Sequence, residues 1–115
     1  MDHTIVSLRV RPFPKIKQDP SIWSLISSQQ IQLDEETHQN FLETKRLTSR
    51  AKTSFLFDYC FPQNQDNPSI YQTVVKPLVM SSLKGINSCL FMYGQTGSGK
   101  TYTMLGGVNN SNIFQ

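Results

Sequence analysis

The segment that most constrains the fold of this chain runs from Cys89 to Met104 and reads CLFMYGQTGSGKTYTM. A short apolar run of strand length leads directly into a glycine-rich turn, which ends in a lysine and a threonine. Gly94 to Thr101 match the pattern G-x-x-x-x-G-K-[ST] at every position, the signature of a loop that binds phosphate groups. We therefore expect an α/β fold in which a strand, this loop and a helix follow one another.

The residue types in the loop indicate how it would hold a polyphosphate. Backbone N–H groups can surround phosphates closely only where side chains are absent, and Gly94, Gly97 and Gly99 meet that need. Lys100 would reach the β- and γ-phosphates, and the Thr101 hydroxyl would coordinate Mg²⁺. The N-terminus of the following helix would direct further N–H groups at the same anion. The other loop residues predicted to contact the nucleotide are Gln95, Thr96 and Ser98.

A candidate contact for the base lies at the end of the first predicted strand. Arg9, Arg11 and Pro12 stand there, and Tyr102 directly follows the phosphate loop. Arginine and aromatic faces of this kind can enclose a flat purine ring. The spacing alone leaves a solvent-facing alternative open, because arginines that flank a valine in a strand commonly point into water.

Short β-prone runs predict strands at residues 4–10, 53–61 and 88–93. Proline follows the first run closely, and the second run ends at Pro62, where a backbone donor for the ladder is missing. Residues 18–54 are polar and irregular, so we expect only small strands and turns there.

A helix is predicted from Asn67 to the glycine at position 85. Asn67 can cap its first turn, and Pro68 suits the first helical position. Gly85 is typical of the residue that ends a helix. Pro77 interrupts the pattern and predicts a kink, because an interior proline removes one backbone hydrogen bond.

Composition excludes few classes of function. The net charge of +3 is too small to indicate a nucleic-acid partner, and the basic run at 44–52 is interpreted as a solvated loop or strand edge. No apolar stretch is long enough to span a bilayer, and we expect a cytoplasmic protein without a secretion signal. Cys60 and Cys89 lie in apolar runs typical of buried free thiols, and His3 and His38 lack zinc-site spacing.

In this order, several segments resemble the N-terminal part of a kinesin motor domain. They are VRP after the first strand, FLFDYCF, IYQTVVKPLVMSSLKGIN and LFMYGQTGSGKTYTMLG, and YGQTGSGKTYTM is the most specific of them. The resemblance implies the fold of a P-loop NTPase that binds ATP and Mg²⁺. It places Arg9, Arg11, Pro12 and Tyr102 beside the adenine and residues 94–101 around the phosphates. It also implies that Asp58, although it ends an apolar run, is structural and not catalytic.

The resemblance further implies that residues 1–115 are an N-terminal fragment of such a domain. The switch motifs N-x-x-S-S-R-S-H and D-x-A-G-x-E do not occur in the 115 residues. The microtubule-binding elements and the neck would follow them. The parent protein would then hydrolyse ATP for movement along microtubules of the cytoskeleton, while this fragment alone would not turn ATP over. Without later strands beside it, the strand at 88–93 would expose apolar edges and favour aggregation.

Two other functions remain open from the sequence. One is a truncated, catalytically inactive module that binds nucleotide or a partner. The other is an unrelated P-loop NTPase or small-molecule kinase, in which the phosphate loop usually lies near the N-terminus. The position of the loop at residues 94–101 disfavours this second alternative.

Overall fold

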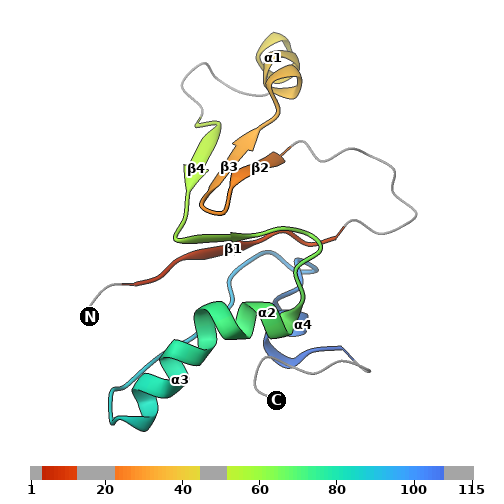
Figure 1. The fold of residues 1–115 in the computed structure, drawn as a ribbon. Coiled ribbons are helices and arrows are strands. Elements are labelled where there is room, and N and C mark those ends of the chain that lie inside the picture. The colour runs from red at the N-terminus through yellow and green to blue at the C-terminus, as the bar shows by residue number, and fades with distance from the viewer. Residues whose placement is uncertain (1–3, 13–22, 45–51, 108–115) are drawn as a thin grey trace. The chain divides into compact units, whose positions relative to one another are not determined.

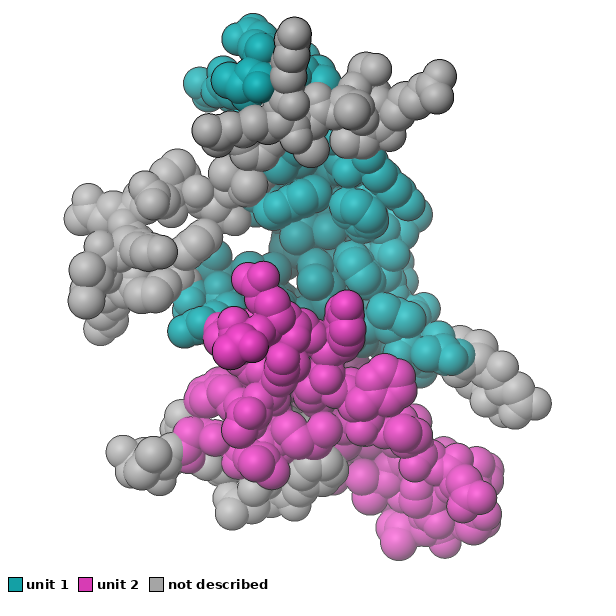
Figure 2. All heavy atoms as spheres, turned by 180° about the vertical axis from the view of Figure 1, so that it is seen from behind, with its two compact units in different colours: residues 1–63 teal, residues 64–115 magenta. Residues whose placement is uncertain are grey.

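The computed structural model describes residues 4–12, 23–44 and 52–107 of the chain. The chain divides into two compact units, residues 1–63 and 64–115, and we describe each by itself (Figures 1 and 2). Within the described residues, the first unit contains the β-strands and one helix, and the second contains helices and the glycine-rich loop.

The first unit holds two small sheets. In one, β1 (Ser7–Arg9) pairs in parallel with β5 (Tyr59–Phe61). In the other, β2 (Trp23–Ser27), β3 (Gln30–Leu33) and β4 (Ser54–Leu56) form an antiparallel sheet in that order. The predicted strand at the N-terminus is thus confirmed, though it is shorter than expected, and its partner comes from much later in the sequence.

Apolar residues alternate with polar ones along these strands. Because successive side chains of a strand point to opposite faces, the apolar ones gather on one face of the antiparallel sheet. Trp23 lies opposite Leu33, Leu25 opposite Ile31, and Ile31 in turn opposite Phe55. Leu33 is only 4% exposed, and the Trp23 and Phe55 rings lie with their centroids 5.9 Å apart. The apolar face, rather than the Ser- and Gln-rich opposite face, therefore sets the register of this sheet.

The prediction of one strand over residues 53–61 is wrong, because two strands of different sheets occupy it. The separation occurs at Phe57 and Asp58, whose backbone amides donate to different segments. Phe57 N donates to the Gln29 carbonyl at 2.8 Å, and Asp58 N donates to the Val6 carbonyl at 2.9 Å. The Asp58 carboxylate accepts a further hydrogen bond from Val6 N at 2.8 Å. Asp58 thus holds the chain where it passes from one sheet to the other.

Residues 35–43 form a helix that the sequence analysis did not predict. In α1 (Glu35–Glu43), the Asp34 side chain caps the first turn by accepting from Thr37 N at 3.1 Å. The expectation of only small strands and turns between 18 and 54 is therefore wrong here. The signal was present, since a capping aspartate followed by acidic residues favours a helix start. The basic run at 44–52 lies outside the described residues, apart from its two ends.

Burial decides the state of the thiol in the first unit. Cys60 in β5 is 5% exposed, beside Phe61 at 7%. Burial raises the pKa of the Cys60 thiol above its usual value, so the thiol stays protonated at neutral pH. A protonated buried thiol packs as a small apolar group.

The second unit begins with the predicted helix, which consists of three parts. They are α2 (Asn67–Ile70), a π-helical segment η1 (Tyr71–Val75) and α3 (Lys76–Leu83). Ile70 and Val75 on this helix are buried, at 5% and 2% exposed. No helix in the described ranges is long and apolar enough to cross a membrane.

The first turn of this helix is capped by a different residue from the one predicted. Asp66 is the N-cap, and its side chain accepts a hydrogen bond from Ser69 N at 3.0 Å. Asn67 is instead the first helical residue, and Pro68 lies in the first turn as expected. Because Asp66 satisfies the open backbone donor, the Asn67 side chain is available for another contact.

The π-helical segment accounts for Pro77. In η1 the amide of Lys76 donates to the carbonyl of Tyr71, five residues back, and one extra residue is thereby inserted into the helix. Pro77 then falls in the first turn of α3, where a missing N–H is tolerated. The sequence predicted a kink at Pro77, and the structure has instead a widened, π-helical turn directly before this proline.

The glycine at the end of the helix closes it as predicted. Gly85 has a φ of +86°, which favours glycine strongly. Its amide donates to the Ser82 carbonyl at 3.0 Å, and the Ile86 amide donates to the Ser81 carbonyl at 3.1 Å. These two bonds form a Schellman motif, which satisfies the last carbonyls of α3.

The strand predicted at residues 88–93 does not form. Within the described part of the chain, no backbone group from Cys89 to Tyr93 is hydrogen-bonded to another segment, and a strand requires such a ladder. Phe91 is 74% exposed and Tyr93 is 98% exposed. Cys89 is exposed as well, so the expectation of a buried thiol holds for Cys60 and is wrong for Cys89.

We expect the substitution Phe91→Lys to reduce self-association of the chain, because a charge on an unpaired apolar segment opposes strand addition. Leu83→Lys is the matched control, since Leu83 is 76% exposed but lies in a helix with its backbone paired. Sedimentation velocity at neutral pH should show a mass closer to the monomer for the first variant only. Equal effects of both substitutions would contradict a special role for the unpaired segment.

Candidate functional site: the glycine-rich loop

The glycine-rich loop connects residues 88–93 to α4 (Lys100–Leu105). Gly97 and Gly99 have φ values of +80° and +101°, a backbone conformation that residues with a side chain rarely adopt. Ser98 N donates to the Gln95 carbonyl at 3.1 Å and closes a turn between them. Gly99 is the N-cap of α4, where no side chain caps the helix. Backbone groups therefore line this turn.

Gly94 is required for a different reason, namely close approach. A Cβ atom built at Gly94 would lie 2.5 Å from Ser98 Oγ and 3.2 Å from Ser98 Cβ. The first distance is far below van der Waals contact, so a side chain at position 94 would require the Ser98 side chain to move. The first residue of the motif thus allows the loop to fold back on itself.

The side chain of Lys100 closes the loop. Its Nζ donates to the Gly94 carbonyl oxygen at 2.5 Å, and the side chain is half-buried. The ammonium is therefore held at the Gly94 carbonyl, at the start of the loop, rather than extended into water. An ammonium has three donors, and this bond uses one of them, so a bound anion can be met by the others.

The helix after the loop is held by two side-chain hydrogen bonds. Thr103 is buried, and its Oγ1 donates to the carbonyl of Gly99, the N-cap residue, at 2.9 Å. In the middle of α4, the Tyr102 carbonyl accepts from Gly106 N at 2.8 Å and from Asn67 Nδ2 at 3.0 Å. Sequence reasoning missed the roles of Thr103 and Asn67. The first has the four-residue spacing of a helical back-bond, but nothing in the sequence pairs Asn67 with position 102.

The predicted phosphate-loop residues all lie in this one turn and the first turn of α4, because they are contiguous in sequence. Thr101 is exposed in that first turn, and Tyr102 beside it is 43% exposed. Within the described ranges, no group of three or more His, Cys, Asp and Glu side chains is arranged to hold a metal ion. The loop itself is thus the candidate site in the second unit.

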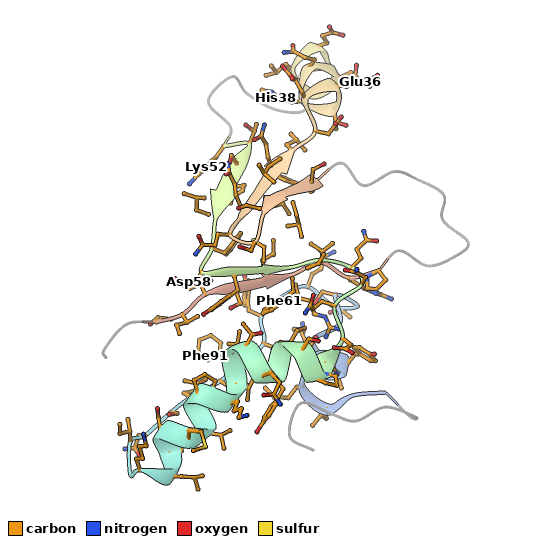
Figure 3. All side chains as sticks on the ribbon, viewed as in Figure 1. Glu36, His38, Lys52, Asp58, Phe61 and Phe91 are labelled. Atoms are coloured by element: carbon orange, nitrogen blue, oxygen red, sulfur yellow. The ribbon has the colours of Figure 1, made fainter. Side chains whose placement is uncertain are left out.

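The predicted contacts to the base belong to the first unit. Arg9 ends β1 and is half-buried, whereas Arg11 and Pro12 follow it and are exposed. Their role beside a purine ring stays a prediction. Asp58, which is labelled in Figure 3, also belongs to the first unit, and its carboxylate accepts a hydrogen bond from the backbone amide of Val6.

The sequence matches one family over most of its length. The family model described as "Kinesin motor domain" covers residues 9–114. The chain is 35% identical over 114 residues to the kinesin-like protein KIN-8A of Arabidopsis thaliana. This match covers 96% of this chain and 15% of that protein. It is 37% identical over 103 residues to the kinesin-like protein KIF14 of Mus musculus, covering 88% of this chain and 6% of that protein.

The fold is similar to solved kinesin structures. One is a KIF14 structure with ADP, in complex with a microtubule, which has a TM-score of 0.74 and 28% identity and covers 97% of this chain. Another, of a fast kinesin, has a TM-score of 0.67 and 29% identity and covers 87% of this chain. The chain spans 30% and 25% of these two structures. The similarity therefore concerns a part of each of them, and the fold is that of a P-loop NTPase in partial form.

We expect the substitution Gly94→Ala to distort the loop and to destabilise the second unit by about 1–3 kcal/mol, because the new Cβ overlaps Ser98 Oγ. The double variant Gly94→Ala/Ser98→Gly removes both close atoms and should recover most of that loss. Ser98→Gly alone completes a double-mutant cycle, measured by urea unfolding. Simple additivity of the two substitutions would show that the contact is unimportant.

Proposed function

The chain belongs to the kinesin motor-domain family, and from this premise we propose that it forms the ATP-binding part of a microtubule motor. The observation that carries the proposal is the loop at residues 94–101. Its glycines carry no side chains, and its lysine is hydrogen-bonded to the Gly94 carbonyl at the start of the turn. This arrangement suits the phosphate groups of a nucleotide.

The residues present fit a nucleotide with Mg²⁺. A Cβ at Gly94 would lie 2.5 Å from Ser98 Oγ, and Gly97 and Gly99 have positive φ, so all three positions favour a backbone without side chains. Lys100 would supply its remaining N–H donors to the β- and γ-phosphates, and the exposed hydroxyl of Thr101 would coordinate Mg²⁺. When bound, Mg²⁺ neutralises charge that develops on the phosphates during transfer. We assign Gln95, Thr96 and Ser98 to backbone and side-chain contacts with the same groups.

From the family resemblance we further propose that Arg9, Arg11 and Pro12 of the first unit contact the adenine base, and we propose a contact with the base for Tyr102 of the second unit separately. The Tyr102 ring is 43% exposed and so offers a face for stacking, and Arg11 and Pro12 are exposed after the end of β1. The resemblance of the RVRP segment at residues 9–12 to the family pattern supports the assignment of Arg9, Arg11 and Pro12.

The whole protein is proposed to hydrolyse ATP and to move along microtubules of the cytoplasmic cytoskeleton. The KIF14 structure that this chain resembles is in complex with a microtubule, which supports tubulin as the partner. Because the chain spans 30% of that structure, we propose that residues 1–115 are the N-terminal part of a motor domain. An alternative is nucleotide binding without turnover by this chain alone, which the lack of both switch motifs in the 115 residues favours.

We expect Lys100→Ala to weaken ATP binding by about 10- to 100-fold, because a charge-assisted hydrogen bond to phosphate is lost. Lys84→Ala is the matched control, since Lys84 is exposed at the end of α3 in the same unit. Calorimetric titration with ATP in excess Mg²⁺ measures both dissociation constants. The proposal is refuted if the unmodified chain binds no ATP, or if both lysine variants lose affinity equally.

Thr101→Ala tests the proposed metal contact separately. The affinity for ATP in the presence of EDTA should change little, whereas the gain in affinity that Mg²⁺ gives should fall by about tenfold. Thr96→Ala is the control, because this exposed threonine of the loop is assigned no metal contact. A loss of affinity that is the same with and without Mg²⁺ would remove Thr101 from the metal site.

A further inference from the structure

Asn67 is a buried polar residue without a place in the nucleotide site proposed above. It is 3% exposed, and its Nδ2 donates to the Tyr102 carbonyl at 3.0 Å. The bond joins the start of α2 to α4, which lie side by side in the second unit (Figure 1). A buried amide is costly unless it is hydrogen-bonded, so this contact has a strong geometric requirement.

The geometry of α2 makes Asn67 a rigid anchor. Asp66 caps the helix through Ser69 N, and Pro68 restricts the backbone directly after Asn67. Ile70, one turn later, is 5% exposed in the core. The backbone position from which the Asn67 side chain extends is therefore fixed by the helix.

By contrast, α4 needs external support. It has six residues, fewer than a helix needs for stability on its own in water. Thr103 fixes it to Gly99 at the loop, while its Tyr102 carbonyl accepts from both Gly106 N and Asn67 Nδ2. The Asn67 contact is a side-chain hydrogen bond that ties α4 to a different helix.

We propose that Asn67 is a positioning residue for nucleotide binding, which acts through the Tyr102 carbonyl to hold α4 in place. Lys100 and Thr101 form the first turn of that helix, so a displacement of α4 moves both of their side chains. Small misplacements of this kind are enough to reduce the strength of phosphate contacts. This inference rests on the proposed function, because the site that it supports is the ATP site.

The test compares Asn67→Ala and the isosteric Asn67→Asp, which lacks the N–H donor, with Ile70→Ala in the full chain. Ile70 is buried on the same helix and apolar, so its truncation loosens packing without removing the bond to Tyr102. The first readout is amide hydrogen exchange without nucleotide at Thr103 and Gly106. The second is the dissociation constant for ATP with Mg²⁺, measured at a temperature where each variant is folded.

For both Asn67 variants we expect exchange at Gly106 to rise about tenfold relative to exchange within α3, and the dissociation constant to rise about tenfold. Asn67→Gln, which keeps the amide donor, should partly restore both the slow exchange at Gly106 and the affinity for ATP. Ile70→Ala should lower thermal stability without the selective change in α4. The proposal is overturned if Ile70→Ala reproduces both effects, or if the Asn67 variants leave α4 exchange or ATP affinity unchanged.

The two readouts separate this inference from the proposed function. Should the unmodified chain bind no ATP, the proposed function fails, and with it the role of Asn67 toward nucleotide. The exchange comparison needs no nucleotide, so it still decides whether Asn67 holds α4. Normal ATP binding with unaffected affinity in the Asn67 variants overturns the inference alone.

Discussion

The hydrogen bond from Lys100 Nζ to the Gly94 carbonyl closes the loop on which the proposed function depends. It joins the first residue of the motif to the first residue of α4, so the intervening backbone is held in a tight curve. That curve is favoured because Gly94 has no side chain to meet Ser98 and because two later glycines adopt positive φ. A positive charge is thereby placed beside bare backbone, which is the arrangement that a polyphosphate requires.

The loop is held by contacts from two directions. Thr103 fixes the start of α4 to Gly99, and Asn67 fixes the middle of α4 to the first helix of the unit. The helix that begins with α2 is itself hydrogen-bonded at both ends. Asp66 caps its start, and a Schellman motif at Gly85 closes its end. In the first unit, Asp58 has a comparable structural task, since it fixes the passage between two sheets.

Local patterns predicted the elements whose causes are local. The helix at 67–83, its glycine end and the bare turn at 94–99 follow from caps, proline and glycine positions, which act within a few residues. The single strand expected at 53–61 was wrong because its division depends on amides that bind distant carbonyls at Gln29 and Val6. The strand expected at 88–93 was wrong because an apolar run becomes a strand only when another segment pairs with it.

The sequence by itself determined the family, the glycine-rich turn and the identity of the residues proposed to bind phosphate, because these depend on a contiguous motif with fixed spacing. Only the tertiary structure decided which residues hold that turn in place. Asn67 and the Tyr102 carbonyl are separated by 35 positions, and no periodicity relates them. Their contact follows from how two helices pack, and packing of that kind is set by the whole unit rather than by any local pattern.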